Sequence, residues 1–417
     1  MATENDPEKI PQGIELTPFD ETFRNDPHPR LKTLRQTCPV RRDPEFNQVL
    51  IASEALVRDI VRNHDLGVDP RKANPEDSVQ QFRPMDEDIE PSMLFLDDPD
   101  HQRLRKLVAP AFAPRKAEAQ RAMIREVAEE LVAAIQPDAN GEFDLIESLA
   151  GPLPAVAIAK ILGIDPDRQS QFKEWSESSS AAFFTGGLDE SLRAAGEAAL
   201  ENLRALFTEE VAKRKAHKGR EPEDLIGEMV HAQEDGDRFT EAEILTMCNL
   251  LLIAGNVTTS DLIGNGLRTL LLHPDQVQDL RDAPEKLPGA IEEMLRFDPP
   301  VTVSGRITPT EISLDGVTVG ARESVSVLLS AANRDPAIHD DPDQFRMDRE
   351  DPQHLSFGGG AHFCLGAHLA RVEAQEAVRA ILGRFSHLEV IEQSADWKMV
   401  PGFRGMASLR LRVVAED

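Results

Sequence analysis

The chain has 417 residues, with 46 Lys and Arg against 74 Asp and Glu, a formal net charge of -28 and 40% hydrophobic residues. This composition is typical of a folded soluble protein; it excludes a globally basic nucleic-acid-binding protein and disfavours binding to an anionic membrane surface. Three cysteines do not form a disulfide framework. The polar N-terminus and the lack of any run of ~18 apolar residues predict no signal peptide or membrane anchor, so we expect a cytoplasmic protein.

The first 90 residues or so are rich in proline and broken into short segments, which predicts a β-rich and loop-rich N-terminal part. One short extended segment is Gln48–Ile51. Residues 74–91 mix proline with many charges, as in a long loop, and such loops in compact domains are usually functional or disordered.

Residues 100–298 have mainly helical patterning. The longest helix is expected to begin after Thr240, where the sequence TEAE forms a capping box, and to end before His273-Pro274. Roughly 30 residues at ~1.5 Å each make it close to 50 Å long. Ala254, Gly255 and Thr258 share one face in its middle. Two interpretations stand: a notch of small residues crossed by another helix, or a groove that holds a ligand beside a hydroxyl group.

Residues 300–350 alternate in the manner of β-strands, with a turn at Asp315-Gly316. Helical patterning returns after Gly366, and residues 397–414 again resemble strands. No clean linker or repeat divides the chain. We therefore expect a single domain over residues 1–417 that is mainly α with a smaller β part.

The segment 354–366 contains the loop FGGGAHFCLG, which ends one residue before a predicted helix. Three consecutive glycines indicate a backbone that closely approaches another group. A cysteine in the position of Cys364, at a helix N-terminus, has its pKa lowered by the helix dipole and by free N–H donors, which favours the thiolate. Cys38 and Cys248 have no such surroundings and are expected to be inert.

Three interpretations of Cys364 compete. It could be a nucleophile activated by His362 or His368. It could be a zinc ligand together with His354, His362 and His368, although zinc–thiolate sites usually show closely spaced cysteine pairs. It could also be the axial ligand of a haem, and only this interpretation uses the rest of the chain.

The loop FGGGAHFCLG resembles the cysteine-loop signature of the cytochrome P-450 haem-thiolate monooxygenases. Further motifs follow the family's order along the chain. HQRLR at 101–105 is similar to the family's H-x-x-x-R motif, and AGNVTT at 254–259 is similar to its A-G-x-D/E-T-T motif. EMLR at 293–296 matches its E-x-x-R motif, and ANRDP at 332–336 and the stretch Phe345…Arg349 also fit. E-x-x-R alone is a weak signal, whereas the set is strong. The resemblance covers about residues 90–375 and implies the cytochrome P-450 fold, with a long central helix over the haem.

The resemblance assigns roles to these residues one by one. It implies that Glu293 and Arg296 form a buried structural network that serves folding and haem incorporation. It implies haem b with Cys364 as the iron ligand. The expected haem contacts are these: His101, Arg105, Arg306 and His362 at the propionates, Phe357 over the sulfur, Gly358 and Gly366 in the loop, and Ala254 and Gly255 on the long helix.

The implied reaction is activation of dioxygen and insertion of one oxygen atom into a small apolar organic substrate. Because no flavin or iron–sulfur domain is recognisable, we expect electrons from a separate ferredoxin and its NAD(P)H-dependent reductase. Basic residues that could steer a ferredoxin are Arg103, Lys106, Arg115, Lys116 and Arg371. Candidate pocket residues are Phe82, Met85, Phe95, Phe183, Phe184, Leu251, Val301, Val303 and Phe403.

Two other functions remain open. A peroxide-driven haem-thiolate peroxygenase would share the cysteine loop, although the retained Thr258 disfavours it. A non-catalytic zinc-binding or thiol-bearing helical protein is the alternative from another class. Absence of a haem spectrum would favour the latter.

The long helix departs from the family pattern at one position. The family has Asp or Glu before the first threonine, where it helps to deliver protons during oxygen activation, but this chain has Val257, which cannot relay a proton. We expect Thr258 and ordered water to carry the relay. Asp261, at i+4 from Val257, is a candidate proton source, and Asn256 is polar but cannot ionise.

Overall fold

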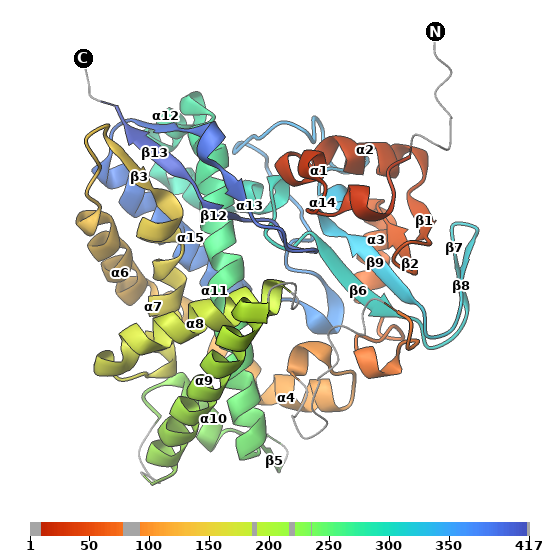
Figure 1. Cartoon of the computed structure of the whole chain (residues 1–417), viewed down its shortest axis with the longest axis horizontal. Helices are drawn as coiled ribbons and strands as arrows, with labels where there is room; N and C mark the ends of the chain where they lie inside the picture. Colours follow the sequence, from red (N-terminus) through yellow and green to blue (C-terminus); the bar gives the residue numbers. More distant parts are fainter. Residues whose placement is uncertain (1–9, 78–91, 186–189, 217–221, 235, 415–417) are drawn as a thin grey trace. The chain divides into compact units, whose positions relative to one another are not determined.

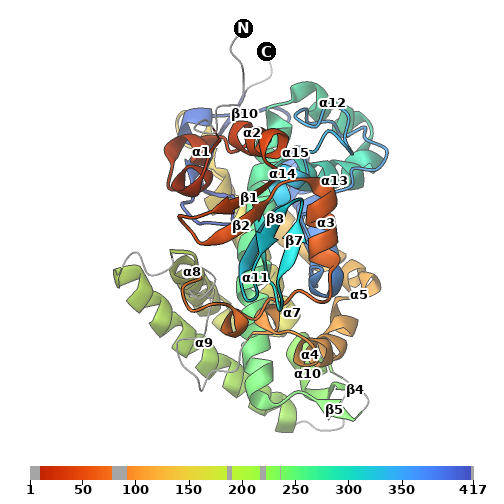
Figure 2. The same ribbon diagram turned by 90° about the vertical axis from the view of Figure 1, so that its right-hand side faces the viewer.

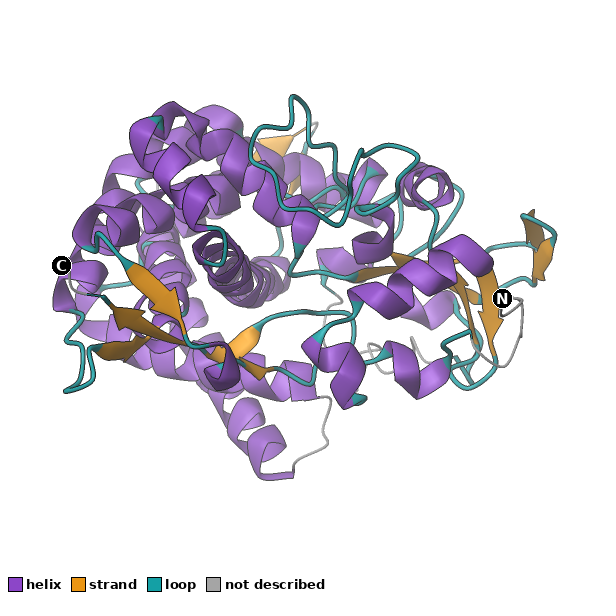
Figure 3. Cartoon of the chain, turned by 90° about the horizontal axis from the view of Figure 1, so that it is seen from above, coloured by secondary structure: helices purple, strands orange, loops and turns teal. Residues whose placement is uncertain are grey.

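A computed structural model describes residues 10–77, 92–185, 190–216, 222–234 and 236–414. The chain divides into two compact units: unit 1 comprises Met1–Arg83, Arg268–Cys364 and Asp396–Ala407, and unit 2 comprises Pro84–Leu267, Leu365–Ala395 and Ser408–Asp417. Helices are the main elements and strands the minor ones (Figure 3), as expected from the sequence.

Unit 1 contains a four-stranded sheet in the order β1-β2-β9-β6 (Figures 1 and 2). Its strands are β1 (Val40–Asp43), β2 (Gln48–Ile51), β6 (Val303–Ile307) and β9 (Ser324–Leu328). The β2–β9 pair is parallel and the other pairs are antiparallel. The predicted strand at Gln48–Ile51 is therefore confirmed.

A hairpin of β7 (Ile312–Leu314) and β8 (Val317–Val319) belongs to the same unit. Its turn lies at the predicted position. Asp315 and Gly316 both have positive φ, at 47° and 81°. Aspartate and glycine are suited to this conformation, which a two-residue hairpin turn requires.

The helices of unit 1 come from segments before, between and after these strands. They are α1 (Glu21–Asn25), α2 (His28–Thr37), α3 (Glu54–Arg62), α12 (Pro274–Asp282), α13 (Leu287–Phe297) and α14 (Leu329–Ala332). In the N-terminal part, which was expected to be rich in strands and loops, α1, α2 and α3 accompany β1 and β2. Helix α3 forms because Val57, Ile60 and Val61 share one face, and this face packs against the apolar side of the sheet.

Unit 2 is mostly helical. Its helices are α4 (Asp100–Val108), α5 (Pro114–Ala119), α6 (Arg121–Ala134), α7 (Pro152–Leu162), α8 (Gln169–Thr185), α9 (Glu190–Ala216), α10 (Leu225–His231), α11 (Glu241–Leu271, whose last turn lies in unit 1) and α15 (Ala367–Arg384). Its short strands are β3 (Glu142–Asp144), β10 (Leu388–Val390) and β13 (Arg410–Val413), which form one sheet, and β4 (Gln233–Glu234), which pairs with β5 (Asp237–Arg238). The remaining pair, β11 (Asp396–Trp397) with β12 (Met406–Ser408), belongs to unit 1 except for Ser408.

The predicted long helix is confirmed as α11. Its capping box is formed as expected: the Glu243 N–H donates to Thr240 Oγ1 at 3.1 Å, and the Thr240 N–H donates to Glu243 Oε2 at 2.7 Å. By length and composition alone α11 could cross a membrane, but a buried core helix of a soluble protein meets the same test. No membrane assignment follows from it.

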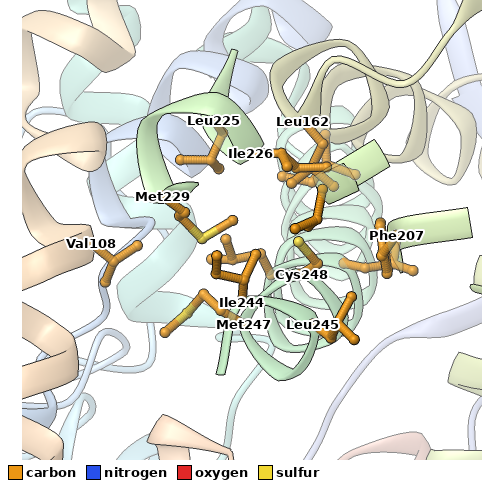
Figure 4. Packing of buried hydrophobic residues seen from close by; sticks show 14 of the residues in the cluster. Val108, Leu162, Phe207, Leu225, Ile226, Met229, Ile244, Leu245, Met247 and Cys248 are labelled. Carbon is orange, nitrogen blue, oxygen red and sulfur yellow. The ribbon is translucent and has the colours of Figure 1, made fainter. Parts of the chain in front are cut away.

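The N-terminal half of α11 lies in the apolar core of unit 2 (Figure 4). Cys248 is fully buried there, near Phe207 and Leu162, and burial raises the pKa of its thiol. The structure thus confirms Cys248 as a core residue. Cys38 is half-buried, and its thiol donates to Val40 O at 3.3 Å.

Two glutamates one turn apart on α15 have opposite electrostatic environments. Glu376 accepts from Arg121 Nη1 at 2.6 Å and from Arg125 Nε at 2.9 Å, and these bonds overcome the effect of burial and lower its pKa. Glu373 is 3% exposed, and its Oε2 has no hydrogen-bond partner among the described residues. Burial raises the pKa of Glu373 from 4.5 to about 8.

We predict opposite stability effects for Glu373→Gln and Glu376→Gln. The folded protein retains a proton on Glu373 that the unfolded chain loses above pH 4.5, so ionisation of this residue destabilises the fold as the pH rises to about 8. The gain in unfolding free energy from Glu373→Gln should therefore grow by about 1.4 kcal/mol per pH unit in this window. Glu376→Gln should instead cost about 1–3 kcal/mol at pH 7, and this cost should stay constant from pH 5 to 8.5, because the pKa of Glu376 is lowered and the carboxylate is ionised in the folded and the unfolded protein throughout this range. Urea unfolding of both variants from pH 5 to 8.5 measures the effects; equal slopes would contradict the assignment.

Candidate active site

In unit 1 the cysteine loop folds back so that Cys364 lies beside Phe357. The Cys364 N–H donates to Phe357 O at 2.9 Å, and the Gly358 N–H donates to Leu355 O at 2.8 Å. Cys364 is half-buried, and α15 begins three residues later, at Ala367. The rings of Phe357 and Phe363 meet edge to face with centroids 6.2 Å apart. A half-buried cysteine that is held by a backbone hydrogen bond a few residues before a helix N-terminus is suited to a thiolate ligand.

The glycines of this loop have a clear structural reason. Gly358 and Gly360 have φ of 68° and 65°, a region that side chains with Cβ disfavour. A Cβ on Gly360 would also lie 2.6 Å from Val61 O in α3. The loop can therefore pack on the end of α3 only with glycine at this position.

The pair Glu293–Arg296 is fully buried in unit 1, on α13. Arg296 Nε and Nη2 donate to the two Glu293 carboxylate oxygens at 2.6 and 2.7 Å. Arg296 also donates to the carbonyl oxygens of Asn333, Pro342 and Gln344 at 2.9–3.1 Å. The Glu293 carboxylate accepts from the Arg346 N–H at 2.8 Å and from Arg349 Nε at 3.2 Å. The pair thus joins α13 to residues 333–349 through hydrogen bonds that satisfy both charges.

Arg306 is buried on β6 of unit 1. Its Nη1 donates to Ser304 Oγ at 3.0 Å and to Gly305 O at 2.7 Å, and its Nη2 donates to Val61 O at 3.2 Å. These three acceptors hold the guanidinium in one orientation. A guanidinium fixed in this way is a group that can bind a carboxylate such as a propionate. His362 closes the 3-10 turn Gly360–His362 within the cysteine loop and is half-buried.

In unit 2, His101 and Arg105 lie on α4 at the predicted i, i+4 spacing. His101 is buried and Arg105 is half-buried. Burial lowers the pKa of His101, although Asp98 Oδ1, 3.4 Å from Nδ1, opposes this shift. The imidazole is therefore neutral at pH 7 in this environment, and Arg105 supplies the positive charge on this face.

The middle of α11 has an open face of small residues. Ala254 is exposed and Thr258 is half-buried, whereas the flanking turns contain buried residues such as Leu252 and Leu262. A Cβ on Gly255 would meet no atom within 4 Å. Within the described residues, therefore, no helix crosses this notch closely at Gly255, which favours the ligand-groove interpretation. Thr258 Oγ1 donates to Ala254 O at 2.7 Å, as expected of a threonine that bonds to the preceding turn.

Asn256 and Asp261, the other predicted catalytic residues, are both buried. Asn256 Nδ2 donates to Ser176 Oγ of α8 at 3.1 Å. Its side chain thus joins α11 to α8, a contact that no sequence motif indicated. Asp261 is 1% exposed, one turn beyond Val257, as its spacing predicts.

The predicted pocket residues divide into several groups. Val301, Val303 and Phe403 are half-buried in unit 1, and Val301 forms a β-bridge with Phe403. Phe95 is half-buried in unit 2, but Leu251 is 8% exposed and belongs to the apolar core. Phe82 and Met85 lie outside the described residues. Phe183 and Phe184 lie on α8, but their side chains lie outside the description.

The zinc interpretation of Cys364 lacks structural support. In the described part of the chain, no group of three or more His, Cys, Asp or Glu side chains is arranged to hold a metal ion. His354 Nε2 instead lies 3.1 Å from Glu292 Oε2, and His368 is exposed on α15. A single cysteine without such a ligand set is better suited to the axial position of a haem.

Comparisons with known proteins agree with this site. The family model for cytochrome P450 matches residues 64–410. Cytochrome P450 107B1 of Saccharopolyspora erythraea is 37% identical over 95% of this chain and 98% of its own length. Vitamin D(3) 25-hydroxylase of Pseudonocardia autotrophica is 36% identical over 86% of both chains. The structure of cytochrome P450 PksS of Bacillus subtilis superposes with a TM-score of 0.85, at 30% identity over 95% of this chain and 99% of that one.

Proposed function

Since the chain belongs to the cytochrome P450 family of haem-thiolate oxidoreductases, we propose that it oxygenates a small apolar substrate with dioxygen and electrons from a separate ferredoxin system. The observation that carries this proposal is Cys364 in the loop FGGGAHFCLG, held beside Phe357 and directly before α15.

Haem b is the proposed cofactor, and the residues present fit it. When bound, haem supplies the redox chemistry that activates dioxygen, with thiolate ligation favouring O–O cleavage. Cys364 would ligate the iron. His101, Arg105, Arg306 and His362 would bind the propionates. Ala254 and Gly255 leave room for a flat group against α11, because they carry at most one methyl group each.

An apolar substrate is proposed from the half-buried side chains of Phe95, Val301, Val303 and Phe403. Such side chains favour an apolar ligand because contact removes their surface from water. The relative named as a vitamin D(3) 25-hydroxylase acts, by its name, on vitamin D(3). A related substrate class is the economical proposal for this chain.

A ferredoxin and its NAD(P)H-dependent reductase are the proposed electron donors. Basic side chains on a strongly acidic chain would offer local contacts to an acidic partner. Arg103, Lys106, Arg115, Lys116 and Arg371 are the proposed contact residues. In the structure Arg103 pairs with Glu243 and Lys116 pairs with Glu228.

Thr258 is the proposed residue that positions water for proton delivery, since Val257 cannot relay a proton. Thr258→Ala should lower the product formed per NADH consumed by about tenfold or more, with a matching rise in peroxide. The reason is that protons would reach the oxygen more slowly than electrons do. The buried neighbour Thr259 provides a matched control, and Thr259→Ala should leave the coupling unchanged. Equal coupling in the wild type and in Thr258→Ala would exclude Thr258 from proton delivery.

The acid that supplies these protons is a separate question. Val257→Asp restores the carboxyl group of the family pattern and should speed turnover if proton supply is limiting. Asp261→Asn should slow oxygen activation and enlarge its solvent isotope effect if Asp261 is the source. No effect of Asp261→Asn would leave water as the proposed route.

The absorption spectrum of the purified protein tests the proposed function. A Soret band that shifts, on reduction and addition of carbon monoxide, to the wavelength that gives the family its name would support it. A colourless zinc-containing protein would refute it. Substrate turnover with hydrogen peroxide but not with ferredoxin, reductase and NAD(P)H would favour the peroxygenase alternative.

A further inference from the structure

A buried charged cluster in unit 1 joins three segments that are far apart in the chain. Arg404 Nε donates to Asp298 Oδ1 at 2.6 Å, and His28 Nε2 lies 3.7 Å from the same oxygen. Asp298 is 5% exposed and Arg404 is 9% exposed. His28 begins α2, Asp298 follows α13, and Arg404 lies between β11 and β12. A buried pair with this geometry fixes the positions of its segments, because separating the charges would leave each of them unpaired in the core.

The protonation states within the cluster are well defined. Burial lowers the pKa of His28 to about 4, so its imidazole is neutral at pH 7. Burial alone would raise the pKa of Asp298, but the charge of Arg404 and the nearby His28 hold it well below its usual range. Arg334, over the ring of Phe297 at 3.7 Å, adds a further positive charge near Asp298. The Asp298–Arg404 ion pair therefore persists across the neutral pH range.

The whole guanidinium of Arg404 is engaged in contacts. Nη1 donates to Arg24 O at 2.8 Å and Nη2 to Asn25 O at 3.4 Å, both at the end of α1. The guanidinium also stacks over the ring of Trp397 at 3.7 Å. The planar guanidinium group has several N–H donors in a fixed arrangement and can make these contacts at the same time. The ammonium group of a lysine, on its flexible side chain, could not.

The backbone on either side of Arg404 is paired with the segment that follows Asp298. The Arg404 N–H donates to Pro300 O at 2.8 Å, and the Thr302 N–H donates to Gly402 O at 2.9 Å. Between these two bonds, Val301 and Phe403 form a β-bridge. Successive side chains of an extended segment point to opposite sides. Phe403 therefore points away from the buried cluster that holds Arg404, which is consistent with its being half-buried.

We propose that Arg404 is a positioning residue for the substrate: through Asp298 and Trp397 it fixes the turn 400–403 against residues 300–302, and so places Phe403 and Val301 as one apolar wall of the pocket. The inference rests on the proposed function, because it takes Val301 and Phe403 as pocket residues. Arg404 itself does not contact the substrate. Its effect on ligand size selection should therefore pass entirely through Phe403.

Two nitrogen ligands of haem iron test this inference on the purified holoenzyme, namely imidazole and 4-phenylimidazole, each titrated by optical difference spectroscopy. The Kd of imidazole reports access to the iron. The difference between this Kd and that of 4-phenylimidazole reports contact of the added phenyl group with the apolar wall formed by Phe403 and Val301. In Arg404→Gln the ratio of the 4-phenylimidazole Kd to the imidazole Kd should rise about tenfold, since the phenyl group loses a preorganised apolar contact. Phe403→Ala should raise the ratio by a similar factor. The double variant should show no further rise, because both substitutions remove one contact.

Arg410→Gln is the matched control, because Arg410 also pairs with carboxylates, Glu142 and Asp138, but on the half-exposed strand β13. It should leave the ratio unchanged.

An unchanged ratio in Arg404→Gln would overturn the proposal, and so would a double variant in which the effects of the two substitutions on the ratio multiply. If Arg404→Gln does not retain haem, Asp298→Asn replaces it, with the same expected shift. Loss of haem from both variants would also overturn the proposal and make Arg404 a residue of overall stability. A wild type that shows no spectral response to either ligand would instead refute the proposed function.

Discussion

Cys364→Ser is expected to yield a folded protein that lacks the thiolate spectrum with carbon monoxide and whose monooxygenase activity falls at least about 100-fold. The reason is the chemistry of the ligand: a serine oxygen is a far poorer electron donor to iron than a thiolate, so the support for O–O cleavage is lost. The reduced carbon monoxide difference spectrum and product formation per unit of haem measure the two effects. Far-UV circular dichroism verifies the fold.

Cys38→Ser is the matched control for this prediction. Cys38 is half-buried, lies outside the glycine loop, and its thiol donates to a backbone carbonyl as a serine hydroxyl would. The variant should keep the spectrum and activity of the wild type. Normal turnover in Cys364→Ser would remove Cys364 from the axial position, whatever the result for Cys38.

Glu293→Gln should destabilise the folded protein by about 3–5 kcal/mol and reduce the fraction of protein that retains haem. The substitution leaves the buried guanidinium of Arg296 without its countercharge, while the Arg346 N–H and Arg349 Nε lose a carboxylate acceptor. Urea unfolding and the ratio of Soret to protein absorbance measure the two effects.

Glu292→Gln is a neighbouring control on the same helix. The Glu292 side chain is 27% exposed and lies 3.1 Å from His354 Nε2, so water can replace part of its interaction. We expect a loss of about 1 kcal/mol or less. If Glu293→Gln and Glu292→Gln had equal effects, the buried network would not be the feature that stabilises this region.

Much of the local structure was predictable from short sequence patterns. The TEAE box at 240–243 sets the start of α11, because each of its two polar side chains satisfies a backbone N–H of the same turn. Asp315-Gly316 defines the β7–β8 turn through positive φ angles, and the glycines of the cysteine loop define a close backbone approach. The motif set around Cys364 by itself indicates the family. In each case the determining residues are close together in the chain.

Other features depended on tertiary contacts. Asn256 lies beside Thr258 in sequence, yet its amide bonds to Ser176, 80 positions away. Glu373 and Glu376 are the same residue type on one helix, but only Glu376 meets Arg121 and Arg125 of α6. Likewise, no pattern in the sequence joins His28, Asp298 and Arg404. The charge state of a buried group depends on its desolvation and on which charges pack against it. The sequence alone determined the helices, the strands and the motifs, because the residues that specify them are close together in the chain. Only the tertiary structure decided which polar groups are paired and which have their pKa shifted by burial, because their partners come from distant segments.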